Sequence, residues 1–271
     1  MRYLTLTAIG FFSLALARPE RSVVFRDAVG TLTALPGETI TLEALGHRWD
    51  WTAPRSPGLY PLQAVSSDGR DSITIQAFVL VPFSQLKGEY LNGYRIGQYP
   101  SRALRGLAIY RPPRGFIEVT RANENTFVSP HFRLKQFLCK QGGAYPQYVV
   151  LNEALLQKLE FLLERVNAAG YPASSFHVLS GYRTPAYNRA IGNVPYSRHT
   201  FGAAADVFID EDHDGRMDDL NRDGRSDARD GEVLYSLFEA AGVEGGMGEY
   251  PTTSTRGPFV HVDLRDRRTR W

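Results

Sequence analysis

The strongest constraint on the fold is an apolar stripe between residues 151 and 166. Leucines and a valine recur there at three- and four-residue steps, which is the spacing of one face of an α-helix. Asn152 can cap the start of this helix and Gly170 can end it. Further helices are predicted over residues 185–191 and 232–241, and strands over 176–179, 202–209 and 259–264. Because these helices and strands do not alternate regularly, the C-terminal half is expected to be an α+β domain.

Residues 18–83 are expected to form an all-β, sandwich-like region. Short segments there are β-branched or alternate between apolar and polar residues, and Pro-Gly and Asp-Gly turn signals separate them. Trp49 and Trp51 are two residues apart, so on a strand they share one face. Core packing is the favoured role for both indoles, and stacking on a sugar is the alternative. The predicted strands are Val23–Phe25, Thr39–Leu42 and Ile73–Val79.

Glycines and prolines interrupt residues 84–125, which are predicted to form a β-rich connector. Within this segment, Asn92-Gly93 has the composition of a tight hairpin turn. The remaining residues, 126–271, are assigned to the C-terminal domain. The chain of 271 residues is therefore predicted to contain two domains joined by a connector, which agrees with its length.

Residues 1–17 have the pattern of a cleavable secretory signal. Arg2 precedes an apolar run from Tyr3 to Leu14, and an Ala-x-Ala site follows at Ala15 to Ala17. A membrane anchor is the alternative, but the run is shorter than the ~20 residues that span a bilayer. No cysteine follows the run, as a lipoprotein would require. We therefore expect a periplasmic or secreted protein that has no membrane attachment once the signal is removed.

Composition excludes some classes of partner and of cross-link. The net charge is +2, and no basic tract suggests a nucleic-acid partner. Cys139 is the only cysteine of the chain, so no internal disulfide can form. Lone cysteines are usually buried, so a packing role is favoured over a nucleophilic one. The oligomeric state does not follow from the sequence.

Three residues of the C-terminal half are suitable ligands for a catalytic zinc ion: His199, Asp206 and His261. Two imidazoles and one carboxylate leave a fourth position open, which distinguishes catalytic from structural zinc sites. Gly202 and the alanines at 203–205 are small and are expected to let the backbone pass close to a metal. Since two histidines and an aspartate that are distant in sequence are common by chance, the ligand set depends on the motifs around it.

Those motifs resemble the zinc D-alanyl-D-alanine carboxypeptidase superfamily, which also includes VanX-type dipeptidases and the hedgehog signalling domain. The similar segments are Ser180-Gly181-Tyr182-Arg183-Thr184, the pattern S-x-H-x-x-G-x-A-x-D from Ser197 to Asp206, and the late His261-Val262-Asp263. Ser129-Pro130-His131-Phe132 and Phe137-Leu138-Cys139 are similar to the YcbK-like murein endopeptidase branch. The resemblance covers about residues 126–266 and implies zinc peptidase activity.

The resemblance also implies roles for individual residues. Arg183 matches an arginine that faces the substrate, where a guanidinium can stabilise an oxyanion. Ser197, Tyr182 and His131 are candidate substrate contacts, although packing is an equally good role for Tyr182. The family's usual base is missing, because Pro258 and Phe259 occupy the positions where relatives have a glutamate or a histidine.

Two carboxylates are candidates for the missing base. On a strand, Asp263 points to the same side as His261, so it is expected to orient that histidine or to accept a proton. Glu249, in a glycine-rich loop, is the alternative. If neither lies near the metal, the domain would bind its ligand without cutting it.

Residues 210–230 predict a second metal site, for calcium. Nine acids and four arginines give this insertion a net charge of −5, which would repel itself without a cation. Two tandem copies fit the spacing of a calcium loop, with Gly215 and Gly224 at the sixth positions. The first copy has Asn221 at its twelfth position and is expected to be weaker; the role would be structural, and a solvated loop is the alternative. The predicted ligands are Asp210, Asp212, Asp214, Asp218, Asp219, Asn221, Asp223, Asp227 and Asp230.

Together these patterns predict an exported, zinc-dependent peptidoglycan peptidase, with endopeptidase action implied by the YcbK-like resemblance. The expected partner is therefore peptidoglycan. Two alternatives stay open: a non-catalytic cell-wall-binding protein that retains zinc, and an extracellular interaction protein that acts through its β region.

Overall fold

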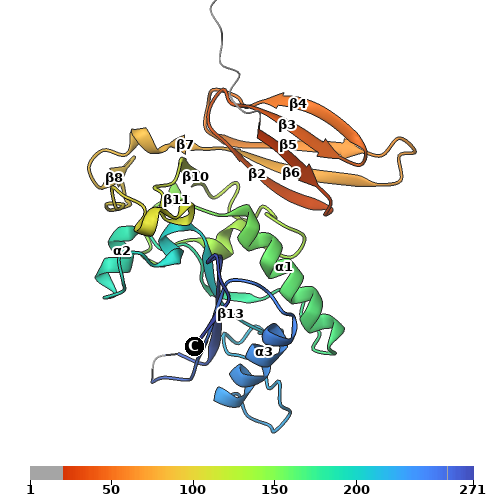
Figure 1. Cartoon of the computed structure of the whole chain (residues 1–271), viewed down its shortest axis with the longest axis vertical. Helices are drawn as coiled ribbons and strands as arrows, with labels where there is room; N and C mark the ends of the chain where they lie inside the picture. The colour runs from red at the N-terminus through yellow and green to blue at the C-terminus, as the bar shows by residue number, and fades with distance from the viewer. Residues whose placement is uncertain (1–20, 255) are drawn as a thin grey trace, which may run out of the picture.

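The computed structural model describes residues 21–254 and 256–271, so the secretory signal predicted over residues 1–17 lies outside the described chain. The N-terminal strands lie at one end of the long axis of the molecule, and helix α3 lies at the other (Figure 1). None of the helices in the described ranges is both long and apolar enough to cross a bilayer.

Two three-stranded sheets, in the orders β1-β3-β4 and β2-β6-β5, make up the N-terminal region. The strands alternate between exposed and buried side chains, and Leu32, Ile40 and Ile75 are fully buried between the sheets. Trp49 and Trp51 pack against the same cluster, which confirms the packing role predicted for them. The strands are β1 (Arg21–Phe25), β2 (Val29–Ala34), β3 (Thr39–Ala44), β4 (His47–Thr52), β5 (Gly58–Val65) and β6 (Ser72–Val79).

The segment after β6 contains fewer strand residues than predicted, because its glycines and prolines break it into turns. The Asn92-Gly93 hairpin is confirmed: it joins β8 to β9, and both turn residues have positive φ, at 47° and 84°. Short 3₁₀ helices and loops fill much of the remainder. The elements are β7 (Val81–Pro82), η1 (Phe83–Gln85), β8 (Tyr90–Leu91), β9 (Tyr94–Arg95), η2 (Leu104–Gly106), η3 (Ala108–Tyr110) and β10 (Gly115–Val119).

Strand β10 connects this segment to both of its neighbours. It pairs on one edge with β7, which directly follows the N-terminal sheets, and on the other with β11 (Gln147–Val149). Ile117 and Val119 of β10 are buried in the same cluster as the leucines of α1. The strand therefore belongs to a hydrophobic core that it shares with the C-terminal half.

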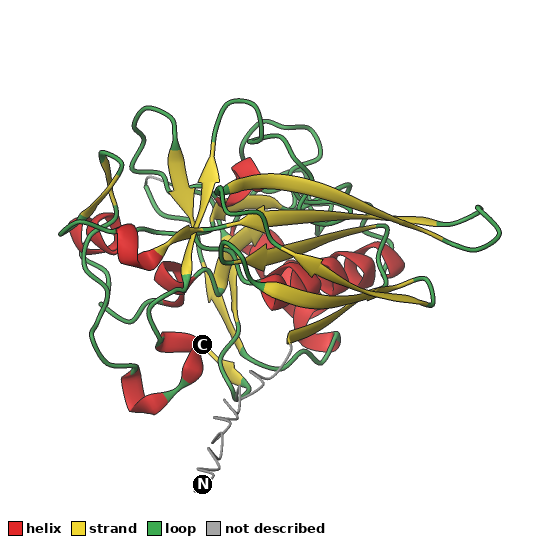
Figure 2. Ribbon diagram, turned by 90° about the horizontal axis from the view of Figure 1, so that it is seen from above, coloured by secondary structure: helices red, strands yellow, loops and turns green. Residues whose placement is uncertain are grey.

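Helix α1 (Glu153–Ala168) begins and ends as predicted. The Asn152 side chain accepts a hydrogen bond from the backbone of Ala154, and Gly170, just after the helix, has a φ of 88°. The N-terminal sheets lie over this helix (Figures 1 and 2). At this contact the Glu153 carboxylate accepts a hydrogen bond from the backbone N–H of Thr33 and pairs with Arg21.

A mixed five-stranded sheet, in the order β12-β13-β15-β14-β16, carries the remaining features of interest. The strands and helices predicted for this part are found within one to four residues of the expected bounds. Before the sheet come η4 (Leu134–Phe137) and β11. The other elements are β12 (His177–Ser180), α2 (Pro185–Ala190), η5 (Arg198–Phe201), β13 (Ala204–Phe208), α3 (Ala228–Ala240), β14 (Gly246–Tyr250), β15 (Phe259–Asp263) and β16 (Thr269–Arg270).

Candidate metal centre

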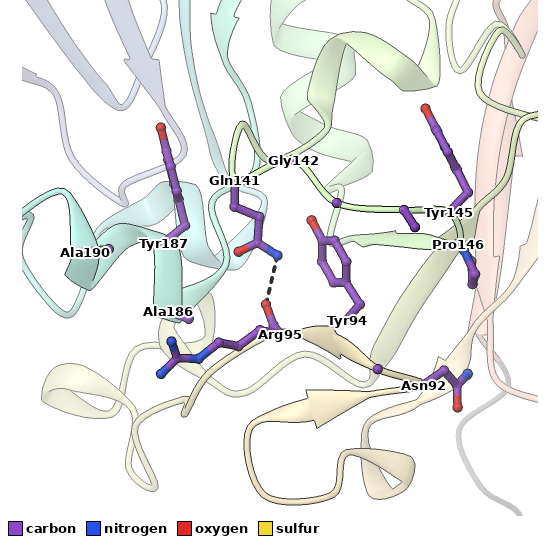
Figure 3. A pocket seen from close by; sticks show the side chains of 13 residues that line it. Asn92, Tyr94, Arg95, Gln141, Gly142, Tyr145, Pro146, Ala186, Tyr187 and Ala190 are labelled. Atoms are coloured by element: carbon purple, nitrogen blue, oxygen red, sulfur yellow. Dashed lines mark hydrogen bonds between the residues drawn. The ribbon is translucent and has the colours of Figure 1, made fainter.

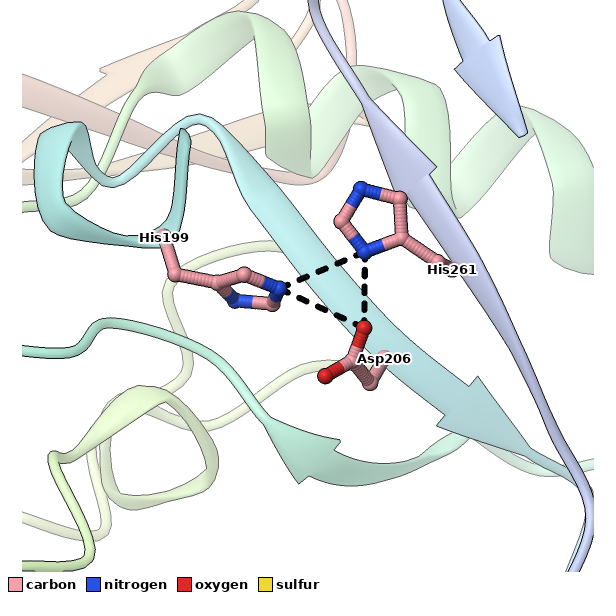
Figure 4. A group of neighbouring side chains, drawn as sticks. All are labelled: His199, Asp206 and His261. Carbon is pink, nitrogen blue, oxygen red and sulfur yellow. Dashed lines mark hydrogen bonds and ion pairs between the residues drawn. The ribbon is translucent and has the colours of Figure 1, made fainter. Parts of the chain in front are cut away.

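Antiparallel pairing of β13 with β15 brings two of the predicted ligands together. Asp206 lies directly opposite His261 in the register, and residues opposite each other project from the same face of a sheet. His199 comes from the 3₁₀ helix η5, immediately before β13. Figure 4 shows the three side chains converging from these three elements.

Gly202, between His199 and β13, has a backbone conformation and a close backbone contact that glycine allows. Its φ is 64°, and a Cβ at this position would lie 2.2 Å from the carbonyl oxygen of Val150. Alanines 203–205 are fully buried in the hydrophobic core. The small residues therefore leave room for a neighbouring backbone and for core packing, and whether they also make room for a metal stays a prediction.

The donor atoms have the spacing of a zinc site. His199 Nε2 lies 3.3 Å from both Asp206 Oδ1 and His261 Nδ1, and the last two atoms are 2.7 Å apart. Tetrahedral ligands at about 2.0–2.1 Å from zinc would lie roughly 3.3 Å from one another. Two of the three separations match this value, and the shortest is a hydrogen bond that would lengthen on metal binding. The residues present therefore fit zinc.

Each imidazole is held by a second contact that leaves one nitrogen facing the group. His199 Nδ1 lies 2.7 Å from the carbonyl oxygen of Gly181, which can only accept, so this nitrogen carries the proton. His261 Nε2 lies 3.3 Å from Asp263 Oδ2. His199 Nε2 and His261 Nδ1 are thus the nitrogens that can bind a metal.

Arg183 contacts a predicted zinc ligand. Its Nη2 donates to Asp206 Oδ2 at 2.5 Å, and its Nε donates to Ser180 Oγ at 2.8 Å. The side chain also lines the pocket over the metal group. Arg183 therefore positions Asp206, a contact that was not expected when it was assigned to the substrate oxyanion.

Burial and the neighbouring charges shift the pKa values of the three candidate ligands in opposite directions. Burial raises the pKa of Asp206, but His199 and His261 outweigh it and hold that pKa well below its usual range. Burial lowers the pKa of His199. Burial also lowers the pKa of His261, yet the hydrogen bonds that Asp206 and Asp263 accept from its ring reverse the shift, so the net change is upward. Asp206 is therefore ionised and His199 is disposed to be neutral, as metal ligands must be.

Asp263 is placed to orient His261, and as a proton acceptor it would be weak. The carboxylate is fully buried, receives a hydrogen bond from the backbone of Gly246 at 2.9 Å, and pairs with Arg265 at 2.7 Å. Burial raises its pKa, but His261 and Arg265 together lower it well below the usual range. A carboxylate with so low a pKa is a weak base.

Glu249 lies on the wrong side of the sheet for the role that was considered for it. In the register it is opposite Val260, whereas its neighbour Gly248 is opposite His261. Because side chains alternate along a strand, Glu249 projects away from His261. A Cβ on Gly231 of α3 would lie 4.0 Å from Glu249 Oε1, so the carboxylate faces that helix. The prediction of Glu249 as a base is therefore wrong.

Two of the three predicted substrate contacts lie away from the pocket. Tyr182 is buried, with its hydroxyl 2.9 Å from that of Tyr99, so it is a packing residue. His131 lies at the surface and pairs with Glu160 of α1, Nδ1 to Oε2 at 2.6 Å. Ser197 does line the pocket. Cys139 is buried, which agrees with the packing role favoured for it.

The pocket over the metal group has a volume of about 590 Å³ and a strongly basic lining that the sequence motifs did not predict. Arg198 Nε and Arg256 Nη1 are buried and have no hydrogen-bond partner among the residues that the structure describes. The only relevant sequence signal was proximity, since Arg198 precedes His199 and Arg265 follows Asp263 by two residues. The cationic side chains of the lining are Lys140, Arg183, Arg198, Arg256 and Arg265.

A second pocket, of about 540 Å³, is lined in part by Ala186, Tyr187 and Ala190 of α2 (Figure 3). Its wall includes Tyr94, Arg95 and Gln141, and Gln141 Nε2 donates to the carbonyl oxygen of Arg95 at 2.9 Å. Tyr187 of α2 lines both this pocket and the one over the metal group. The two pockets are therefore neighbours.

The nine predicted calcium ligands do not gather into one group. Asp210, Asp212 and Asp218 each place a carboxylate oxygen within 4.8 Å of the other two. Asp230 instead accepts backbone N–H bonds with both oxygens, from Leu220 and Asn221 on one and from Asp227 on the other. It caps α3 and joins the ends of the second loop, so its predicted role as a calcium ligand does not match its contacts.

Comparison with known proteins gives one match. Residues 130–235 match the family model described as Peptidase M15, and the matched segment includes His199 and Asp206 but ends before His261. No curated protein and no solved structure matches the chain. The match supports a zinc-dependent metallopeptidase related to the D-Ala-D-Ala carboxypeptidase superfamily, and the His199, Asp206 and His261 group is a possible site for its metal.

Proposed function

We propose that this chain is a zinc-dependent peptidoglycan peptidase that hydrolyses stem or cross-link peptides. The observation that carries the proposal is the convergence of His199 Nε2, Asp206 Oδ1 and His261 Nδ1 on one point beside an open pocket. These atoms would hold the ion. Bound zinc supplies Lewis-acid chemistry at its open position and lowers the pKa of water to about 7.

The neighbouring residues have separate tasks in this proposal. Arg183 fixes the unliganded oxygen of Asp206, and the Gly181 carbonyl and Asp263 fix the two imidazoles. Apart from Asp206, Asp263 is the one carboxylate among the described pocket-lining residues. It is therefore the proposed proton acceptor, and its low pKa predicts slow turnover.

The charge of the pocket supports an anionic peptide as substrate. Five cationic side chains line it, against the carboxylates of Asp206 and Asp263. The unpartnered nitrogens of Arg198 and Arg256 are donors that a carboxylate can satisfy. Stem peptides of peptidoglycan carry such carboxylates.

Endopeptidase action, as in the YcbK-like branch, is part of the proposal. A cross-link peptide extends on both sides of the bond that is cut and so needs two neighbouring binding regions. The two pockets that share Tyr187 supply them. The proposed location is the periplasm or the exterior of the cell, where peptidoglycan lies.

A non-catalytic cell-wall-binding protein is the second candidate function. The specific observation in its favour is the state of Asp263, whose carboxylate is buried and paired with Arg265. Such a protein would retain zinc and bind peptidoglycan without a proton acceptor strong enough for hydrolysis.

Digestion of purified muropeptides by the zinc-loaded chain, followed by mass spectrometry, tests the proposal. We expect new peptide products that disappear after zinc chelation and return when zinc is added. The control is His47→Ala, which alters an exposed histidine of β4 in the N-terminal region. Sacculus binding without any product, with zinc bound, would overturn the peptidase proposal in favour of the binding protein.

A further inference from the structure

A second group of acids follows the strand that carries Asp206. Strand β13 ends at Phe208, and Asp210 comes two residues later. One oxygen each from Asp210, Asp212 and Asp218 lies within 4.8 Å of the others. None of these three residues takes part in the proposed peptidase reaction.

Asp210 has a buried oxygen without a partner. The residue is 6% exposed, and its Oδ2 contacts His177 Nδ1 at 3.0 Å and the backbone N–H of Gly215 at 3.2 Å. Its Oδ1 has no hydrogen-bond partner within residues 21–254 and 256–271. Burying a carboxylate oxygen unsatisfied is costly, so this atom points to a ligand that the chain itself does not supply.

The three carboxylates of this group lie close enough to repel one another when all are ionised. No Lys or Arg side chain forms an ion pair with any of the three acids among the residues described. A divalent cation would relieve this repulsion.

The loop around the group already has the form that a calcium site requires. Gly215, at the sixth position, has a φ of 82°, which permits the sharp turn. Backbone N–H groups of Asp214 and Arg216 bond to Asp212 Oδ1 and Asp214 Oδ1 at 3.1 and 2.8 Å. These bonds fold the loop without using Asp210 Oδ1.

The second copy of the calcium pattern differs in its contacts. Both carboxylate oxygens of Asp230 accept hydrogen bonds from backbone N–H groups. The Arg229 side chain forms ion pairs with Asp223 at 2.9 Å and with Asp227 at 3.2 Å. The acids of this copy are therefore already partly neutralised. The expectation that the first copy is the weaker one is reversed by these contacts.

We propose that Asp210, Asp212 and Asp218 bind one calcium ion at the end of β13, and that the second copy does not bind one. An all-oxygen donor set favours a hard cation over zinc. Loop carbonyls and water would complete the six to eight oxygens that calcium takes. Because Asp206 precedes Asp210 by four residues, the ion fixes the end of the strand that carries a zinc ligand.

Isothermal calorimetry of the full chain with calcium chloride, in saturating zinc, tests this proposal. We expect one calcium ion per chain and a rise in Tm on its binding. Asp212→Asn alters an exposed residue of the group and should weaken calcium binding by about tenfold or more while the circular dichroism spectrum stays unchanged. Asp210→Asn should abolish calcium binding.

Asp223→Asn in the second copy is the matched control, and it should bind calcium as the unaltered chain does. Absence of heat up to millimolar calcium would overturn the proposal, and so would two ions per chain. Equal loss of affinity in Asp223→Asn and Asp212→Asn would also overturn it, since the site would then not belong to the first copy. These outcomes are independent of peptidase activity.

Discussion

Strand β13 leads into two very different metal-binding candidates. In the middle of the strand, Asp206 belongs to a group in which each donor is fixed by a further contact, from Gly181, Asp263 or Arg183. Beyond the C-terminal end of the strand, the acids of residues 210–218 lie in a largely exposed loop, and one oxygen of the buried member has no partner among the described residues. The comparison shows that the fold preforms the first group through its core, whereas the second group would be completed only by the proposed cation.

Removing a donor from the preformed group should give the largest effect. His261→Ala is expected to abolish both zinc binding and muropeptide hydrolysis, because two donors cannot hold the ion with an open position. Zinc content measured by plasma mass spectrometry and product formation should fall to background together. Activity retained at normal zinc content would mean that His261 is not a ligand.

Substituting a residue that orients a zinc donor should have a smaller effect than removing the donor itself, but the effect should still be measurable. Asp263→Asn removes the charge beside His261 Nε2 and is expected to lower zinc affinity by about 10–100-fold. Competition with a chromogenic chelator measures this. Asp266→Asn, an exposed neighbour, is the control and should leave zinc affinity unchanged. An equal effect of both variants would contradict an orienting role for Asp263.

A pair of glycines tests whether the first site depends on close packing and the second does not. Gly202 and Gly215 both have positive φ. A Cβ added at Gly202 would clash with the backbone of Val150, whereas one added at Gly215 would meet no atom within 4 Å. Gly215→Ala should cost about 1–2 kcal/mol of unfolding free energy from backbone strain alone. Gly202→Ala should cost clearly more, since Val150 must also move. Urea unfolding of both variants measures the difference, and equal costs would refute the packing argument.

Calcium removal should have a moderate effect that is confined to the second site. A calcium-selective chelator is expected to lower Tm by several degrees, since a ligand at 100 times its Kd stabilises by about 2.7 kcal/mol. Zinc content should not change. Simultaneous loss of zinc would show that the two sites are not separately held.

The smallest effect is expected at Glu249. Glu249→Gln should leave zinc content and hydrolysis unchanged, because the side chain projects toward α3, away from His261. Steady-state kinetics on muropeptides measure this. A large fall in kcat would place the carboxylate in the reaction and contradict the register argument.

Local patterns in the sequence were sufficient for the helix after Asn152 and for the Asn92-Gly93 hairpin. The approach of His199, Asp206 and His261 was expected from the family resemblance of the motifs around them. The direction in which a strand side chain points depends on how the strands pair, and local sequence patterns carry no information on strand pairing. Glu249 therefore remained an alternative to the favoured Asp263 until β14 was paired with β15.

The same limit explains why His131 was assigned to the cleft although it lies at the surface, and why two roles stayed open for Tyr182 until its burial favoured packing. The basic lining of the pocket was also out of reach. Arg256 and Lys140 lie more than a hundred residues apart and meet only in the folded chain.

The pairing of β10 with both β7 and β11 determines where this protein can be truncated without disrupting its fold. A fragment starting at residue 126 would lack β10, so β11 would lose its only partner strand and Val149 its cover. Exposed strand edges beside apolar surface promote aggregation. Expression of an isolated C-terminal half should therefore begin before β7, and inactivity of a shorter fragment would report misfolding rather than a missing catalytic group.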